Sequence, residues 1–328
     1  MKTIQVEKIG GPEVLQLRDV AGLEPPSPGQ ALVRVVAAGV NFMDIGQRRG
    51  SYPRQLPFIP GVEGAGVVEE IGDEETEAYG IKPSSRVAYA DQPGAYAEAV
   101  LVSADRLIPL PDDFSFEEGA AFPLQGMTAH YLIHEFRKPG PGDVVLIHAA
   151  AGGVGQLLVQ WAHHLGARVI GTVSTDDKAR IVREDGADEV ILYMRQNFAS
   201  EVERLTGGHG ADLILDGVGQ ATFAGDLEAA ADHGHIVMFG AASGPVDPAV
   251  PPSFARKSLT VSSGRLAQFI ANRKDMMQRA DEAIRGMREG WLKLHIDRTL
   301  PLEQAGEAHR LLESRKTAGK IVLTHEEE

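Results

Sequence analysis

The sequence predicts an α/β protein in two parts, a β-rich barrel or partly open sandwich and a doubly wound parallel sheet. The first third of the chain consists of short strand-like runs separated by glycine and proline. From residue 144 onward, apolar strands alternate with helices. The length of 328 residues is also long for one hydrophobic core and natural for two.

The β-rich part is predicted from runs that are apolar throughout or alternate apolar with polar residues. Turn-forming clusters such as Gly10-Gly11-Pro12 divide these runs. Several short strands separated in this way are typical of a barrel or sandwich. The predicted strands cover residues 4–6, 15–18, 31–37, 64–71, 86–89 and 96–102.

A parallel sheet is predicted for the next part because its strands are apolar throughout, which implies burial on both faces. The alternation of strands with helices implies right-handed crossovers. The predicted strands cover residues 144–148, 168–173, 189–193, 211–216 and 235–239, and the helices cover 154–165, 178–184, 198–206 and 223–231. A helical region at 266–290 and a short strand at 320–324 follow.

The composition narrows the classes of function. The chain has no cysteine, which excludes disulfides, thiolate metal ligands and cysteine nucleophiles. The formal net charge of -14 disfavours nucleic acid as a partner. Because the apolar runs are short, we expect no transmembrane helix and no membrane partner, and the cytoplasm is the expected location.

A glycine-rich turn joins the strand 144–148 to the following helix. Its residues are Gly152, Gly153, Val154 and Gly155. Glycines allow a tight turn and a close approach of a pyrophosphate, while the helix N-terminus offers N–H groups to the phosphates. Because the turn lies between a buried strand and a helix, and more such units follow, it predicts a dinucleotide-binding site.

The end of the second strand of this sheet favours NADPH as the cofactor. NAD enzymes usually place an acidic residue there to bind the ribose hydroxyls. Here the strand 168–173 is followed by the neutral residues Ser174 and Thr175. Asp176 and Asp177 are expected in the loop beyond it, and Lys178 opens a helix. A neutral strand end with a nearby cation suits a 2′-phosphate, since each charge-assisted contact contributes about 1.5–3 kcal/mol.

A polar stretch that is expected to be rich in turns follows the strand 31–37. It carries Asn41, Asp44 and Tyr52. Four roles fit these residues: metal ligands, catalytic acids, groups that position a ligand, or turn formers whose side chains bond the local backbone.

Seven segments together resemble the zinc-independent quinone oxidoreductases of the medium-chain dehydrogenase/reductase superfamily over essentially the whole chain. They are GGPEVL at 10–15, GVNFMD at 39–44, PGVEGAGVV at 60–68, GAYAE at 94–98, HAAAGGVG at 148–155, FGAASG at 239–244 and LESR at 312–315. The resemblance implies a GroES-like catalytic domain formed by residues 1–124 and 268–328. It places a Rossmann NADPH-binding domain at 125–267 and implies a homodimer joined through that domain.

The resemblance also implies which residues form the site. It places Asn41 and Tyr52 beside the nicotinamide, with Asp44 in support and Thr128 among the catalytic residues. The other residues that it assigns to the cofactor are Lys178 and Tyr193 at the 2′-phosphate, Phe239 and Gly240 at the nicotinamide ribose, and Arg315 and Lys320 reaching toward the cofactor.

No metal site is expected, because the zinc-dependent relatives use residues that this chain lacks. They carry a cysteine near the position of Asn41, a histidine near that of Val62 and a four-cysteine lobe. Glu63 remains, but one carboxylate does not hold zinc. Without a metal to polarise an alcoholate, hydride should pass to an electron-poor acceptor such as a quinone or an activated enone.

Three functions compete at this point. The leading hypothesis is an NADPH-dependent quinone reductase. A second is an NADPH-dependent reductase of an activated carbon–carbon double bond in an enone, acrylate or enoyl thioester, which needs a proton donor such as Tyr52 or a water held by Asp44. A third is a non-catalytic NADPH-binding sensor.

Two departures from the family pattern bear on substrate preference. Gly46 stands where the family often has an aromatic residue, and we expect it to open the nicotinamide pocket or loosen cofactor binding. Gln125 stands where the family often has a lysine, so a positive charge is missing there.

Overall fold

The computed structural model describes residues 1–73, 79–247 and 252–325. The chain forms two compact units, of which the first comprises residues 1–124, 270–280 and 294–328. The second comprises residues 125–269 and 281–293. The predicted limits 1–124, 125–267 and 268–328 differ from these units mainly because residues 281–293 pack with the second unit.

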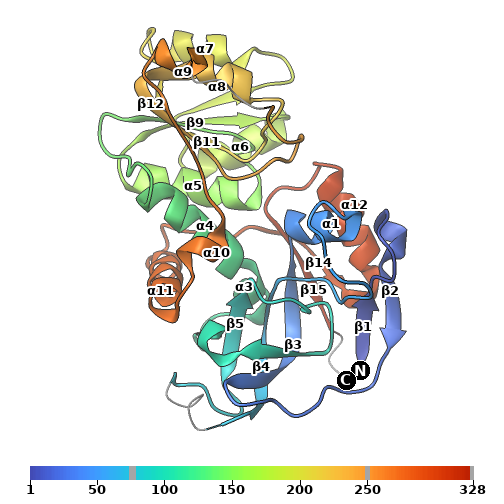
Figure 1. Ribbon diagram of the computed structural model, residues 1–328. Helices are drawn as coiled ribbons and strands as arrows, with labels where there is room; N and C mark the ends of the chain where they lie inside the picture. The colour runs from blue at the N-terminus through green and yellow to red at the C-terminus, as the bar shows by residue number, and fades with distance from the viewer. Residues whose placement is uncertain (74–78, 248–251, 326–328) are drawn as a thin grey trace. The chain divides into compact units, whose positions relative to one another are not determined.

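The first unit is built on a seven-stranded sheet with the order β14-β15-β3-β4-β5-β7, in which β6 also pairs with β3 (Figure 1). Only β14 and β15 pair in parallel, and the other pairs in this sheet are antiparallel. The strands are β3 (Gln30–Val40), β4 (Glu63–Ile71), β5 (Arg86–Ala90), β6 (Ala99–Ser103), β7 (Ile108–Pro109), β14 (Ile296–Pro301) and β15 (Lys320–Thr324). A separate pair consists of β1 (Lys2–Gln5) and β2 (Gln16–Asp19).

The register of β15 on β3 brings a segment near the C-terminus against a strand from the first forty residues. Ile321 lies opposite Val40 in this antiparallel pair. Lys320 therefore lies beside Asn41, which follows β3 directly. This pairing positions the polar site of the first unit.

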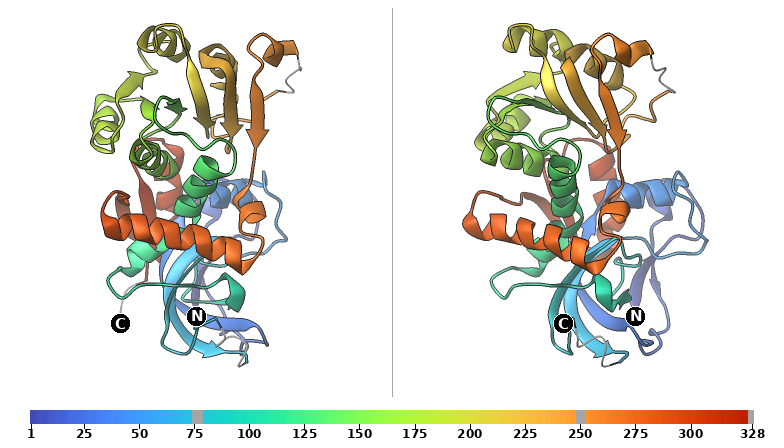
Figure 2. Two further views of the ribbon diagram at one scale, coloured as in Figure 1. Left: turned by 90° about the vertical axis from the view of Figure 1, so that its left-hand side faces the viewer. Right: turned by 60° about the vertical axis from the view of Figure 1, so that its left-hand side comes forward.

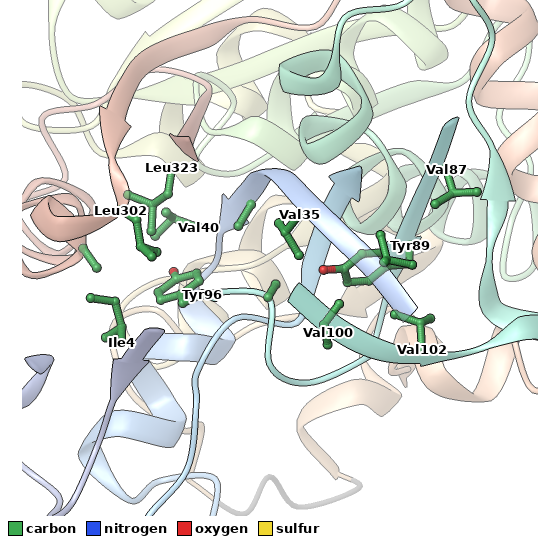
Figure 3. Packing of buried hydrophobic residues seen from close by; sticks show 14 of the residues in the cluster. Ile4, Val35, Val40, Val87, Tyr89, Tyr96, Val100, Val102, Leu302 and Leu323 are labelled. Carbon is green, nitrogen blue, oxygen red and sulfur yellow. The ribbon is translucent and has the colours of Figure 1, made fainter. Parts of the chain in front are cut away.

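Figure 3 shows the core of the first unit. Side chains from β3, β5, β6, β15 and neighbouring segments form one apolar cluster around the buried rings of Tyr89 and Tyr96. The helices of this unit are α1 (Phe42–Arg49), α3 (Phe116–Ala121) and α12 (Ala305–Glu313), with 3-10 turns η1 (Pro12–Val14), η2 (Ala104–Arg106) and η3 (Leu302–Gln304).

The second unit is built on a six-stranded sheet with the order β10-β9-β8-β11-β12-β13, in which all neighbouring strands are parallel. This is the order of doubly wound dinucleotide-binding sheets. The strands are β8 (Val144–Ile147), β9 (Arg168–Val173), β10 (Glu189–Leu192), β11 (Ala211–Asp216), β12 (Ala230–Met238) and β13 (Thr260–Ser263). Figure 2 shows β13 at the edge of the sheet, beside β12.

Helices cover both faces of this sheet. Figure 1 shows α5 on one side and α7 and α8 on the other. The face toward α7 and α8 is lined by alternate strand residues such as Leu146, Ile170 and Ile214, as expected for strands buried on both faces. The helices are α5 (Gly153–His164), α6 (Asp176–Glu184), α7 (Phe198–Leu205), α8 (Phe223–Ala229), α9 (Pro252–Ala255) and α10 (Leu266–Phe269). The predicted α/β class with a doubly wound parallel sheet is thereby confirmed.

Two helices begin in one unit and end in the other. They are α4 (Pro123–His134) and α11 (Arg273–Glu289). The predicted helical region 266–290 is interrupted, because α10 ends at Phe269 and the side chain of Asn272 caps α11 by accepting the N–H of Asp275 at 3.0 Å.

The prediction of a turn-rich stretch after β3 was wrong, because this stretch contains the helix α1. Asn41 is its N-cap, and Asp44 Oδ2 accepts the Asn41 N–H at 2.8 Å. Gly50 ends the helix with a φ of 83°, a left-handed conformation that favours glycine. Asp44 is thus placed by helix geometry and points into the interior.

Candidate functional site

The glycine turn of the second unit leaves no room for larger residues at Gly155. A Cβ atom there would lie 2.4 Å from the carbonyl oxygen of Ala149 and 2.8 Å from Cα of Ala150. At Gly152 the same atom would lie 3.2 Å from the Ala149 oxygen. The turn ends in the 12-residue helix α5, whose first N–H groups have no partner within the helix. These features fit the binding of a pyrophosphate.

Gln125 lies directly against this turn. A Cβ atom on Gly153 would lie 2.2 Å from both Oε1 and Nε2 of the Gln125 side chain. The neutral amide of Gln125 therefore covers Gly153, at a position where the resemblance leads us to expect a lysine.

The residues after β9 form a helix start, and the prediction that Asp176 and Asp177 lie in a loop was wrong. Both occupy the first turn of α6, where acidic side chains favour the positive end of the helix dipole. Thr175 is the N-cap, and its side chain accepts the N–H of Lys178 at 3.3 Å. Asp176 pairs with Arg195 at 2.9 Å, so its charge is directed to a neighbouring cation.

The predicted cofactor residues of the second unit gather at one edge of the sheet. Ser174 follows β9, Tyr193 follows β10, and Phe239 and Gly240 follow β12. The glycine turn follows β8. Because the carboxyl ends of parallel strands lie along the same edge, this is where doubly wound sheets bind their ligands. Tyr193 is 44% exposed, which leaves its ring accessible to a ligand.

Asn41 belongs to a buried polar group in the first unit. Its Oδ1 accepts from Lys320 Nζ at 2.7 Å, while its Nδ2 donates to Glu63 Oε2 at 3.0 Å and to the Gly39 carbonyl at 3.2 Å. Lys320 Nζ also donates to Glu63 Oε2 at 2.5 Å. The second carboxylate oxygen of Glu63 accepts the N–H of Leu124 at 2.7 Å. These partners fix the orientation of the Asn41 amide.

This polar group does not suit a zinc ion. Asn41 offers an amide in place of a thiolate, Val62 offers an aliphatic side chain, and Lys320 places an ammonium between Asn41 and Glu63. Zinc prefers thiolate, imidazole and carboxylate ligands and would be repelled by that ammonium. The contacts that Lys320 makes are with Asn41 and Glu63, while its predicted contact with the cofactor stays a prediction.

Asp44 continues the polar group through a chain of buried hydrogen bonds. Tyr96 Oη donates to Asp44 Oδ2 at 3.2 Å, and His309 Nε2 lies 3.2 Å from Tyr96 Oη. Arg48 Nη1 lies 3.4 Å from His309 Nδ1 and can only donate. His309 is therefore the Nε2–H tautomer, and the bonds run in one direction from Arg48 to Asp44. Arg48 also pairs with Glu313.

Burial shifts the pKa values of the side chains in this hydrogen-bonded series. Desolvation raises the pKa of Asp44 from 3.8 to about 7, against the lowering effects of the Asn41 N–H, Lys320 and Tyr96. Desolvation and the adjacent Arg48 charge lower the pKa of His309 to about 3, which agrees with the neutral tautomer. Burial and the Asp44 charge raise the pKa of Tyr96 well above its usual value. Of the three side chains Asp44, Tyr96 and His309, Asp44 is therefore the one that can change charge near neutral pH.

Tyr52 fills the space beside Gly46. A Cβ atom on Gly46 would lie 2.3 Å from Cδ2 and 2.6 Å from Cε2 of the Tyr52 ring, and the Tyr52 N–H donates to the Gly46 carbonyl at 3.2 Å. The ring of Tyr52 therefore occupies the space beside Gly46, while the predicted effect of Gly46 on the nicotinamide pocket or on cofactor binding stays a prediction. Tyr52 remains 47% exposed.

The remaining predicted residues lie on other elements. Thr128 is a buried residue of α4, and Arg315 is an exposed residue just after α12 with a φ of 58°.

Within the described residues, no helix is both long and apolar enough to cross a bilayer.

The sequence did not predict Tyr96, His309 or Arg48 as members of the polar group. Tyr96 and His309 are 213 residues apart, so no local spacing connects them. The available signal was weaker: Arg48 lies four residues after Asp44, on the helix face that turns inward.

Comparison with known proteins agrees with this architecture. Residues 27–112 match the alcohol dehydrogenase GroES-like domain, and residues 153–283 match the zinc-binding dehydrogenase family. The quinone oxidoreductase of Pseudomonas aeruginosa is 40% identical over 98% of this chain and 99% of its own length. The 2-haloacrylate reductase of a Burkholderia species is 38% identical over 97% of each chain.

A solved structure of Escherichia coli quinone oxidoreductase complexed with NADPH has a TM-score of 0.94 and is 35% identical, covering 99% of this chain and 100% of its own. A GroES-like sheet and a doubly wound parallel sheet in one chain define the architecture of the medium-chain dehydrogenases/reductases. Within that superfamily, the chain belongs to the zinc-independent quinone oxidoreductase family.

Proposed function

We propose that the protein is an oxidoreductase that transfers hydride from NADPH to a quinone. The observation that carries this proposal is the match, over nearly the whole chain, to quinone oxidoreductases in both sequence and fold. The quinone oxidoreductase of Escherichia coli is solved with NADPH, and the carboxyl edge of the second unit has the glycine turn that such a cofactor needs.

NADPH, when bound, supplies the hydride, and a quinone that gains this hydride and one proton becomes a hydroquinone. The protein has to bind and orient the two reactants. For the second unit we propose that Gly152, Gly153, Val154 and Gly155 receive the pyrophosphate on their N–H groups. Ser174, Lys178 and Tyr193 are proposed at the 2′-phosphate, with Phe239 and Gly240 at the nicotinamide ribose.

In the first unit, we propose that Asn41 and Tyr52 orient the nicotinamide and the acceptor. Asn41 suits this role because Lys320 and Glu63 hold its amide in one orientation. Lys320 is then a positioning residue that acts through Asn41, and Asp44 supports the same segment from inside α1. Thr128 and Arg315 are retained as further proposed contacts.

A second candidate is reduction of an activated carbon–carbon double bond. The 2-haloacrylate reductase of Burkholderia is nearly as similar to this chain as the quinone oxidoreductases are. Such a reaction requires a proton for the α carbon. The carboxyl group of Asp44 can hold a proton near neutral pH, because burial raises its pKa to about 7. Hydrogen bonds connect it to Tyr96 and, through Tyr96, to His309.

The two candidates are separated by following the loss of NADPH absorbance with a panel of quinones and a panel of enones and 2-haloacrylates. We expect faster turnover with quinones and lower KM for NADPH than for NADH. Faster turnover with the second panel would replace the proposal by its rival. No turnover with either panel would leave the non-catalytic NADPH-binding sensor.

We also retain three proposals about the whole protein. They are domain limits at 1–124, 125–267 and 268–328, a homodimer joined through the Rossmann domain, and a cytoplasmic location. Light scattering on the purified protein tests the homodimer, and a monomeric mass would count against it.

A further inference from the structure

Two histidines and a glutamate form a compact group in the second unit, and none of the three belongs to the glycine turn or to the polar group of Asn41. His130 and His134 lie four residues apart on α4, and Glu282 lies on α11. One ligand atom from each of the three residues lies within 4.8 Å of the others. Residues four apart on a helix share one face, so both imidazoles are presented to the same side.

The distances in this group suit a bound metal ion. Nε2 of His130 lies 3.0 Å from Glu282 Oε2, and Nε2 of His134 lies 4.0 Å from the same oxygen. Ligand bonds of about 2.1 Å in a tetrahedral arrangement place the donor atoms about 3.4 Å apart. The two observed distances bracket this value, and the donor atoms of the two histidines lie within 4.8 Å of one another, so we expect side-chain rotations to bring the three donors onto one ion.

The three side chains differ in exposure, with one ligand buried and two partly open to solvent. The His130 side chain is 2% exposed, whereas those of His134 and Glu282 are 19% and 28% exposed. A fixed buried ligand with two partly exposed ones lets a hydrated ion enter and lose part of its water shell. The sequence signal for this site is the i, i+4 histidine pair in His130-Tyr131-Leu132-Ile133-His134.

We propose that His130, His134 and Glu282 bind a divalent transition-metal ion of the Zn²⁺ type. Two imidazoles and one carboxylate are a ligand set that Zn²⁺ accepts, with water in the fourth position. The ion would tie α4 to the second half of α11. This site uses other residues than the cysteine and histidine positions of the zinc-dependent relatives in the superfamily, and it is independent of the proposed reaction.

Tryptophan fluorescence can report on this site, because both tryptophans of the chain lie close to it. The ring centroid of Trp161 is 5.5 Å from that of His130 and 5.9 Å from that of His134. The centroid of Trp291 is 5.3 Å from that of Trp161. Co²⁺ should therefore quench the fluorescence on binding, and Zn²⁺ should reverse the quenching by competition.

The experiment uses the full chain without an affinity tag, freed of metal with a chelator. Zn²⁺ bound after equilibrium dialysis should reach one ion per chain. His134→Ala and Glu282→Gln should each weaken binding of Zn²⁺ and Co²⁺ at least ten-fold, since each removes one of three ligands. These two positions are partly exposed, so the variants should fold, and NADPH turnover verifies this without depending on the metal.

His209→Ala is the matched control, because the half-exposed His209 pairs with Asp212 at 3.2 Å, and among the described residues this pair belongs to no group of three possible metal ligands. Zn²⁺ binding should be unchanged in this variant. The proposal is overturned if the native protein binds no stoichiometric Zn²⁺, if either site variant binds it as tightly as the native protein, or if His209→Ala weakens it equally.

Discussion

The ammonium of Lys320 and the carboxylate of Glu63 form an ion pair at 2.5 Å inside the first unit, and each side chain is at most 2% exposed. The two residues are 257 positions apart, and they meet because β15 pairs with β3 at the point where β4 begins. Since Asn41 bonds to both, the ion pair also fixes the amide on which the proposed site depends.

Removing the cation alone should destabilise the protein strongly. Lys320→Met leaves Glu63 charged, buried and without its ionic partner, which costs about 3–5 kcal/mol. Urea unfolding measures the loss of unfolding free energy. The double variant Lys320→Met with Glu63→Gln should recover part of that loss, because no buried charge is left uncompensated. Equal stability of the native protein and Lys320→Met would show that the ion pair is dispensable.

The pH dependence of stability should reveal the protonation of Asp44. Burial raises its pKa from 3.8 to about 7, so the native state holds an extra proton between these values. Its contribution to the unfolding free energy is therefore largest below pH 4 and falls by on the order of 4 kcal/mol as the pH rises to 7. Asp44→Asn, which can still accept from Asn41 and Tyr96, should lack this fall.

The measurement compares urea unfolding of the native protein and Asp44→Asn from pH 4 to pH 8, where the variant should gain relative stability as the pH rises. Asp112→Asn, which changes an exposed carboxylate in the same unit, serves as the control. Parallel profiles for the native protein and Asp44→Asn would contradict the raised pKa.

Asn41→Ala should lower kcat/KM about ten-fold or more, equivalent to about 1.4 kcal/mol of transition-state stabilisation. The amide that Lys320 and Glu63 hold is lost, although their ion pair remains. Asn272→Ala is the matched control, because Asn272 also caps a helix but lies at the start of α11. It should cost about 1 kcal/mol of stability and leave turnover unchanged. Full activity of Asn41→Ala would reduce Asn41 to a helix cap.

Lys178→Ala should discriminate between the two nicotinamide cofactors. Loss of a charge-assisted contact to the 2′-phosphate costs about 1.5–3 kcal/mol, which weakens NADPH binding roughly ten- to hundred-fold. NADH binding should change little. Arg180→Ala removes a cation from the same helix that pairs with Glu184 at 3.0 Å, and it should affect neither cofactor. Equal losses of NADPH and NADH in Lys178→Ala would reject the assignment.

Five strands of the parallel sheet could be predicted from the sequence, because each contains a largely apolar run and helical segments separate them. The edge strand β13 was not predicted, since its sequence Thr-Val-Ser-Ser is mostly polar and none of its residues is buried. The helix α1 could not be predicted, since Gly46, Gly50 and Pro53 dominate the local pattern while its stability comes from caps and from Asp44 and Ile45 facing inward. The start of α6 was misread for a different reason: Thr175 followed by two acidic residues is also a helix-start signal.

In the candidate site, too, some residues could be predicted from the sequence and others could not. Asn41, Asp44 and the glycine turn stand in recognisable local motifs. Their partners do not, because Tyr96, His309 and Lys320 reach them through strand pairing and packing over long sequence separations. A single sequence carries no signal for such contacts, and so the direction of the hydrogen-bond chain and the raised pKa of Asp44 required the structure.

The ring of Tyr52 against Gly46 limits which pairs of residues this chain can accept at the two positions. The two positions share one volume, so a bulky residue at 46 must displace the ring at 52. In this chain a larger residue at position 46 therefore requires either a smaller residue at position 52 or a new position for the Tyr52 ring, which is 47% exposed. Exchanging the two residues together should therefore be tolerated far better than placing a second ring at Gly46 alone.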